Sequence, residues 1–168
     1  MRVVAVSVGA IKPVEWDAGT LAVTAIEKHP VAGPVRITSL GVEGNDFADK
    51  ENHGDEWMRV YAYSLEDYAF WEQTIGAVRP GLFGEQLTTE GVDLNAALVG
   101  EIWRVGTALL QVAHVRIPCQ TFKGWMGTSG YDESHWVKRF TLAGRVGPYF
   151  RVLEEGAVSY THLTLPTN

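Results

Sequence analysis

The residue with the most reactive chemistry in this sequence is its single cysteine, Cys119. It follows Pro118, and two cations, Arg116 and Lys123, lie close to it along the chain. Neighbouring cations favour the thiolate, which is the form that binds soft metals or attacks electrophiles. A lone cysteine is also often a small buried hydrophobe, and both interpretations stay open on the residues alone. A single cysteine excludes an internal disulfide and a Cys-x-x-Cys metal site.

A histidine and a second cation are the next candidates for chemistry. His53 lies in a polar stretch, residues 52–55, where no core needs filling. It is either a metal ligand or proton carrier, or a solvated loop side chain. Lys12 follows the first apolar run. Together with Arg116 it forms either a cationic floor for a phosphate or oxyanion, or two ordinary surface cations.

The segment Gly84-Glu85-Gln86 combines a glycine, where backbone can approach a ligand, with two polar side chains. A turn with two exposed polar side chains explains the same residues. The sequence contains no Gly-x-Gly-x-x-Gly fingerprint, phosphate-binding Gly-x-x-x-x-Gly-Lys loop, Gly-x-Ser-x-Gly elbow or His-Glu-x-x-His motif. Their absence argues against the common nucleotide-binding, serine-hydrolase and zinc-protease arrangements.

The apolar pattern predicts that mostly strands position these candidates. Short β-branched or alternating runs between Gly, Pro and Asp turns predict strands at 2–8, 22–26, 35–38, 60–63, 83–89, 102–105, 108–115 and 149–153. Ser64 predicts the start of a helix that stops near Gly76, and a second helix is expected over 134–143. The expected architecture is a β-barrel with helical insertions, with Cys119 on a loop at the end of a strand.

Length and composition indicate one soluble domain. The chain has 168 residues, of which 46% are hydrophobic and 20% charged, and this usage argues against disorder. No apolar run approaches the roughly 18 residues of a membrane span. The formal net charge is −6 without a cluster of Lys or Arg, which argues against nucleic acid as a partner. We therefore expect a cytoplasmic protein that binds neither membrane nor nucleic acid.

Several segments, in their order along the chain, resemble the MOSC domain family, which is named for the C-terminal part of molybdenum cofactor sulfurases. The resemblance is to its small stand-alone YiiM-like branch. It covers roughly residues 1–158 and rests on the segments at 41–45, 48–49, 53–54, 60–63, 80–91, 100–106 and 110–119. The last of these ends in the Arg-x-Pro-Cys motif, Arg116 to Cys119. The chain departs from the family at 55–57, after His-Gly, and at Gln86, where the family commonly has Asn.

The resemblance implies a mainly β fold, a MOSC-type barrel of mostly antiparallel strands with a few helices. It also implies that Cys119 ligates the molybdenum of a pterin cofactor (molybdopterin). His53 would then donate a proton as an N–O bond breaks, while Lys12 and Arg116 neutralise phosphate or oxo charge. The remaining cofactor-binding residues would be Gly84, Glu85, Gln86 and Pro118.

Small stand-alone members of the family resemble reductases that detoxify N-hydroxylated bases, so a small oxidoreductase is the leading expectation. Such an enzyme needs an electron-donor protein. The alternative is a sulfur carrier in which Cys119 holds a persulfide, supplied by a cysteine desulfurase that would itself carry any pyridoxal phosphate. A third class is a binding barrel with an inert cysteine. The aromatic face of the helix at 64–75 suits either the core or a homodimer contact.

The last ten residues, 159–168, differ in style from the preceding chain. They read SYTHLTLPTN, without Asp, Glu, Lys or Arg. Relatives continue at this point with a Gly-Asp turn and another barrel strand. We therefore expect the domain to occupy residues 1–158, without its C-terminal barrel strand, and residues 159–168 to be foreign sequence.

Overall fold

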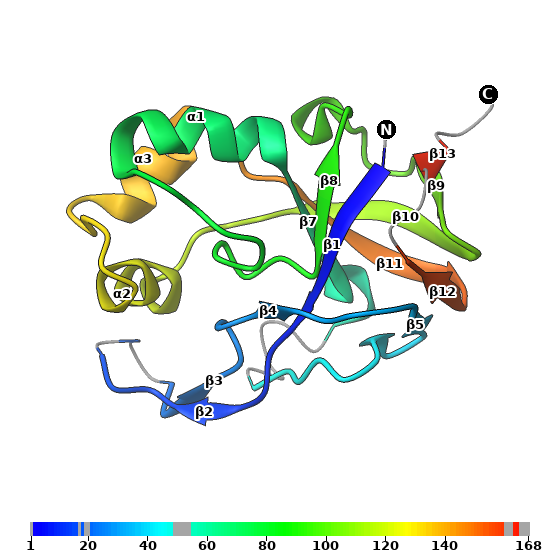
Figure 1. Ribbon diagram of the computed structural model, residues 1–168, viewed down its shortest axis with the longest axis horizontal. Helices are drawn as coiled ribbons and strands as arrows, with labels where there is room; N and C mark the ends of the chain where they lie inside the picture. The colour runs from blue at the N-terminus through cyan, green and yellow to red at the C-terminus, as the bar shows by residue number, and fades with distance from the viewer. Residues whose placement is uncertain (1, 17, 19–20, 49–54, 160–162, 165–168) are drawn as a thin grey trace.

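An eight-stranded sheet forms the largest unit of the computed structural model, which describes residues 2–16, 18, 21–48, 55–159 and 163–164 (Figure 1). Its strand order is β13-β9-β10-β11-β7-β8-β1-β4. The strands are β1 (Arg2–Val8), β4 (His29–Pro30), β7 (Val60–Ser64), β8 (Leu87–Glu90), β9 (Ile102–Val105), β10 (Ala108–Val115), β11 (Pro148–Glu154) and β13 (Leu163–Thr164). Only β7 and β8 pair in parallel; the other pairs are antiparallel.

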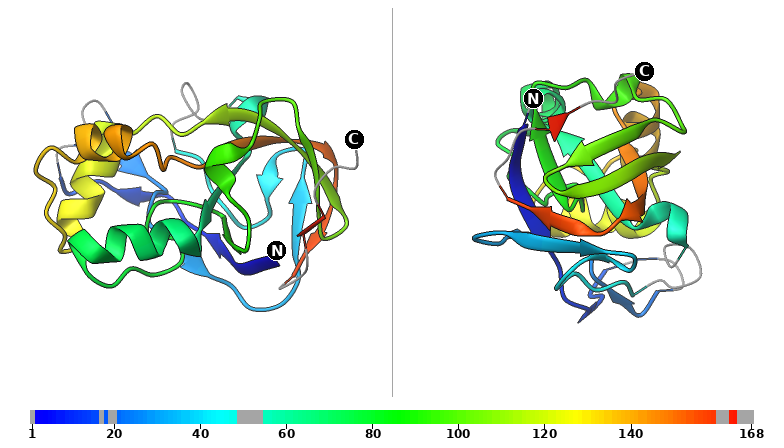
Figure 2. Two further views of the ribbon diagram at one scale, coloured as in Figure 1. Left: turned by 90° about the horizontal axis from the view of Figure 1, so that it is seen from above. Right: turned by 90° about the vertical axis from the view of Figure 1, so that its right-hand side faces the viewer.

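Two small sheets complete the β structure. One contains β12 (Gly156–Val158), β5 (Val35–Thr38) and β6 (Gly41–Val42), and the other contains β2 (Lys12–Pro13) and β3 (Val23–Thr24). Seen from the end, the strands curve around a common interior (Figure 2). That interior is a mainly aliphatic hydrophobic core whose members include Val3, Ile37, Val60, Leu110 and Phe150. In the described part of the chain, the end strands β13 and β4 do not pair with each other, so the large sheet is open.

Three helices gather at one end of the sheet (Figure 1). They are α1 (Leu65–Ile75), α2 (Gln120–Thr128) and α3 (Trp136–Ala143), and two 3₁₀ turns, η1 (Glu56–Met58) and η2 (Leu94–Ala96), lie elsewhere. A second, aromatic cluster packs the helices onto the sheet. In it, Tyr63 stacks near Phe83 and Phe140, and Trp71 lies parallel to Phe140. Each helix of the described residues is too short or too polar to cross a membrane.

The mainly β, mostly antiparallel fold is confirmed, but as an open sheet instead of a closed barrel. Ser64 caps α1 as predicted, because its hydroxyl accepts a hydrogen bond from the backbone N–H of Asp67. The predicted strand at 83–89 begins only at Leu87, because tight turns occupy the residues before it. Helix α2 was not predicted, so Cys119 caps a helix where a loop was expected.

Two smaller differences concern the later elements. Helix α3 begins at Trp136 and not near 134, because His135 adopts a left-handed conformation with φ of 54°. Within the last ten residues, the backbone of Leu163–Thr164 pairs antiparallel with β9. That residues 159–168 are foreign to the domain stays a prediction.

Candidate active site

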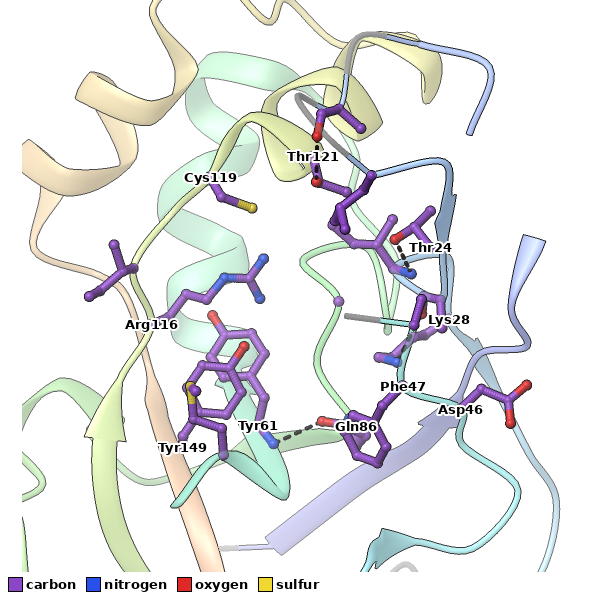
Figure 3. A pocket seen from close by; sticks show the side chains of 18 of the residues that line it. Thr24, Lys28, Asp46, Phe47, Tyr61, Gln86, Arg116, Cys119, Thr121 and Tyr149 are labelled. Atoms are coloured by element: carbon purple, nitrogen blue, oxygen red, sulfur yellow. Dashed lines mark hydrogen bonds between the residues drawn. The ribbon is translucent and has the colours of Figure 1, made fainter. Parts of the chain in front are cut away.

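A cavity of about 720 Å³ lies between α2, the end of β10 and loops from the first third of the chain (Figure 3). Residues distant in sequence form its wall. The N-terminal loops supply Ala18, Leu21, Thr24, Ala25, Ile26, Lys28, Asp46, Phe47 and Ala48. The sheet and the segment leading into α2 supply most of the remainder: Tyr61, Gly84, Gln86, His114, Val115, Arg116, Ile117, Cys119, Gln120, Thr121 and Tyr149.

Arg116 is a buried cation, 6% exposed, just after the end of β10. Its Cζ lies 5.0 Å from the centre of the Tyr61 ring and 4.6 Å from that of Phe122, so aromatic faces support the guanidinium. Its Nη1 donates to the carbonyl oxygen of Phe83 at 3.2 Å. Its Nε has no hydrogen-bond partner among the described residues. Arg116 therefore brings a charge and an unused N–H to the cavity.

Burial disfavours the charged form of Arg116, but neighbouring groups outweigh that effect. The side chains of Tyr149, Tyr61 and Cys119 raise the pKa of the guanidinium above its ordinary value. Burial in turn raises the pKa of both tyrosines, while the charge of Arg116 opposes that rise. Arg116 is consequently a permanent cation between two neutral phenols.

Lys28 is the second buried cation of the cavity, 5% exposed, on the side opposite Arg116 and Cys119 (Figure 3). Its Nζ donates to the carbonyl oxygen of Ala25 at 3.0 Å and to Oδ1 of Asn45 at 2.5 Å. Burial, and then the charge of Arg116, lower the pKa of Lys28 to about 8. Because an ammonium group has three N–H donors, one remains for a ligand.

Two predicted residues, Gly84 and Gln86, form part of the wall near Tyr61. Gly84 has φ of +79°, and a Cβ there would lie 3.3 Å from Cγ1 of Ile26 and 3.6 Å from Nη1 of Arg116. The side-chain oxygen of Gln86 accepts from the backbone N–H of Tyr61 at 2.8 Å (Figure 3). Gln86 thus fixes the strand that presents the Tyr61 ring, and a side chain at Gly84 would press on Ile26 of the wall.

Cys119 shares the cavity with both cations, and its thiol lies on the same side as Arg116 (Figure 3). It is the N-cap residue of α2, and its side chain makes no capping hydrogen bond. It is partly exposed and its sulfur is in no disulfide. Lys123, the other cation predicted to act on Cys119, instead lies 4.0 Å from the carboxylate of Glu133.

The other predicted site residues lie elsewhere. Lys12 is 54% exposed on β2, where it pairs with Glu27 at 2.7 Å, so it does not line the cavity. Glu85 is buried beneath the wall, and Pro118 lies between two lining residues without being one. His53 lies outside the described residues.

Lys28, Tyr61 and Tyr149 were missed as site residues. The sequence gives little signal for Lys28, because it lies between Glu27 and His29 in a polar stretch that resembles an exposed turn. Among the described residues, no group of three or more His, Cys, Asp or Glu side chains could hold a metal ion. The arrangement suits an anion, held by two buried cations, next to a thiol that can serve as a ligand or nucleophile.

Comparison with known proteins gives a consistent family. The family model described as "MOSC domain" matches residues 49–161. The chain is 34% identical to the uncharacterized protein YflK of Bacillus subtilis (strain 168) over 160 residues, covering 94% of the chain and 69% of that protein. It is 34% identical to protein YiiM of Escherichia coli (strain K12) over 141 residues, covering 81% of the chain and 60% of YiiM.

Two further relatives extend the comparison. The crystal structure of YiiM from Geobacillus stearothermophilus superposes with a TM-score of 0.76 at 30% identity, covering 99% of this chain and 75% of that one. A protein of Gibberella moniliformis (strain M3125 / FGSC 7600) named "Reductase" is 29% identical over 144 residues, covering 80% of the chain but only 24% of that protein. The chain therefore matches part of each of these relatives.

Proposed function

The chain belongs to the MOSC domain family, and from that premise we propose that its cavity binds a pterin molybdenum cofactor with Cys119 as the metal ligand. We further propose that the protein is a small reductase of N-hydroxylated compounds. One observation carries the proposal: the thiol of Cys119 shares a single cavity with two buried cations, Lys28 and Arg116. The reductase name of one relative supports the type of reaction.

The residues of the cavity fit such a cofactor in size and in chemistry. Its volume of about 720 Å³ lies within the range of roughly 300–1,000 Å³ that small-molecule sites occupy. A cysteine thiolate is a soft ligand suited to a transition metal. The unpartnered Nε of Arg116 and the remaining N–H of Lys28 suit an anionic phosphate.

Each residue then has a role that follows from its position. Lys28 and Arg116 hold the phosphate of the cofactor, and the rings of Tyr61 and Tyr149 give flat walls for its pterin. Cys119 ligates the molybdenum. When bound, the cofactor supplies two-electron oxygen-atom transfer at its metal.

Reduction of an N-hydroxyl group to N–H takes two electrons and two protons and releases water. An electron-donor protein is the proposed source of the electrons, and His53 remains the proposed proton donor. Lys12, which pairs with Glu27 outside the cavity, is replaced by Lys28 as the proposed partner of Arg116.

Turnover of an N-hydroxylated purine tests the activity. Protein from a cofactor-producing host, with reduced viologen as electron donor, should convert the substrate to the amine, as followed by chromatography. Cys119→Ser, checked for folding by circular dichroism, should lose about 100-fold or more in rate, because the metal loses its protein ligand. Equal turnover by both proteins contradicts the proposal. No turnover by either contradicts the reductase and favours the sulfur-carrier alternative.

A further inference from the structure

Glu85 is a carboxylate buried completely, with 0% of its surface exposed, beneath the wall of the cavity. Its Oε1 accepts from the backbone N–H of Gly81 at 2.7 Å and from Oγ1 of Thr88 at 3.0 Å, and the hydroxyl of Tyr68 also donates to it. Its Oε2 accepts from the backbone N–H of Phe83 at 3.1 Å. Oε1 thus has three donors and Oε2 has one. Burial raises the pKa of the Glu85 carboxyl, and these hydrogen bonds oppose that rise and favour the ionised form.

The loop that Glu85 holds touches both cations of the cavity. The carbonyl oxygen of Phe83 accepts from Arg116 at 3.2 Å. On the other side, a Cβ at Gly81 would lie 2.5 Å from the backbone oxygen of Lys28, so the two backbones are in close contact. By holding this loop, Glu85 therefore fixes the positions of Arg116 and Lys28, which lie on opposite sides of the cavity.

Lys28 and Arg116 carry like charges, and their repulsion in a buried site favours loss of the Lys28 proton. Charges of opposite sign oppose that loss, and Glu85 acts more strongly than Asp46. No described residue forms a salt bridge with Glu85, so its charge is not neutralised locally. The groups that face Lys28 are Arg116, Glu85, Asp46, Asn45, the carbonyl of Ala25, and Arg79, which donates to the backbone oxygen of Lys28 at 2.7 Å.

We propose that Glu85 is a positioning residue that keeps Lys28 charged and Arg116 in place, so that the cavity presents two cations to an anionic ligand. The inference rests on the proposed function only in that the ligand is anionic. Sulfate is a suitable probe because it is a tetrahedral dianion that does not titrate above pH 3. Its affinity for the wild type should be constant from pH 6 to 7 and should fall as pH rises through about 8, where Lys28 loses its proton.

Sulfate affinity, measured by calorimetry from pH 6 to 9.5 at constant ionic strength, distinguishes an electrostatic role of Glu85 from a purely structural one. In Glu85→Gln the fall should occur about one pH unit lower, giving about threefold weaker binding at pH 7.5, a difference that approaches tenfold above about pH 8.5, and nearly equal binding at pH 6. A loss of equal size at every pH would mean a purely structural role and would overturn the proposal, as would an unchanged profile.

Glu101→Gln is the matched control, since Glu101 accepts from Trp103 outside the cavity and its replacement removes the same charge. It should leave the profile unchanged, and a shift as large as that of Glu85→Gln would overturn the proposal. A second test uses the wild type alone, so it does not depend on the folding of a variant. The ¹³Cδ shift of Glu85 should report a carboxylate at pH 7, and a protonated Glu85 would overturn the inference.

These experiments use the chain without molybdenum, so their outcome is independent of the proposed function. Sulfate binding with the expected shift supports the role of Glu85 even if the protein fails to acquire molybdenum. Absence of sulfate binding at all pH values would overturn the role of Glu85 even if molybdenum binds at Cys119.

Discussion

At the scale of single residues, the two buried cations of the cavity oppose folding. Lys28 and Arg116 are both buried and face one another across it. Burial of like charges opposes folding unless other groups compensate it, here the ring faces around Arg116 and the hydrogen bonds of Lys28. Such an arrangement is expected where a ligand of opposite charge binds.

Replacement of Lys28 should make the protein more stable while it removes a ligand contact. The pKa of Lys28 falls from an ordinary value of 10.5 to about 8 in the folded protein, so between these values the unfolded chain binds the extra proton. The penalty that Lys28 imposes on folding therefore shrinks, and the free energy of unfolding increases, as pH rises from 8 to 10.5. Lys28→Met should raise the free energy of unfolding by about 1–3 kcal/mol at pH 7, and the gain should vanish near pH 10.5.

Urea unfolding of the two proteins at pH 7 and pH 10 checks this prediction. Lys12→Met is the control, because Lys12 lies in an exposed ion pair and its loss should change stability by no more than about 1 kcal/mol. A Lys28→Met variant that is less stable than the wild type at pH 7 would contradict the buried-charge account.

Arg116 should not be replaceable by lysine, although lysine keeps the charge. A lysine cannot lie against the rings of Tyr61 and Phe122 while it also donates to Phe83. Calorimetry should therefore show sulfate affinity about tenfold lower in Arg116→Lys, equivalent to about 1.4 kcal/mol. Affinity equal to that of the wild type would mean that charge alone makes the site.

At the scale of elements, the sequence predicted those helices and strands that depend on neighbouring residues alone. Ser64 predicted the start of α1, and the apolar runs at 102–105 and 108–115 predicted β9 and β10. Helix α2 was not predicted, because Gly124 and Gly127 lower the helix propensity of its short sequence. It is held by burial of Phe122, Trp125 and Met126, whose i, i+3, i+4 spacing is a helical signal that sequence reasoning overlooked.

The turn before β8 offers a test at this scale, through two glycines with nearly the same backbone. Gly84 and Gly33 have φ of +79° and +80°, so alanine at either position costs about 1–2 kcal/mol of strain. A Cβ at Gly84 would also lie 3.3 Å from Cγ1 of Ile26 in the cavity wall, whereas at Gly33 it would meet open space among the described residues. Gly84→Ala should weaken sulfate binding, and Gly33→Ala should not.

Thermal unfolding and calorimetry of the two alanine variants check this together. Similar losses of stability, with a loss of sulfate affinity confined to Gly84→Ala, are expected. If both variants bind sulfate like the wild type, the wall at Gly84 does not shape the site.

At the scale of the whole molecule, the site depends on long-range pairings that sequence patterns do not specify. The parallel pairing of β7 with β8 places Tyr61 beside Gln86, and the pairing of β10 with β11 brings Tyr149 to the segment that carries Arg116. Lys28 comes from the segment between β3 and β4, far from Arg116 in the sequence. Of the residues predicted from the sequence, Cys119, Arg116, Gly84 and Gln86 line the cavity and Lys12 does not, and their roles stay predictions.

The net charge of the molecule is opposite in sign to the charges of Lys28 and Arg116 in the cavity. Its formal net charge is −6, but its main cavity contains two buried cations. A cleft of one sign in a low-dielectric wall concentrates field lines and attracts ligands of the opposite sign. The acidic surface should therefore discourage nonspecific binding of anions outside the cavity.

Molybdenum content per chain, measured by elemental mass spectrometry, tests the central claim most directly. The wild type and Cys119→Ser are purified side by side from a host that makes the cofactor. We expect nearly one molybdenum atom per wild-type chain and almost none in the variant, with both proteins folded. Equal molybdenum in the two proteins would contradict ligation by Cys119, and its absence from both would contradict the cofactor site.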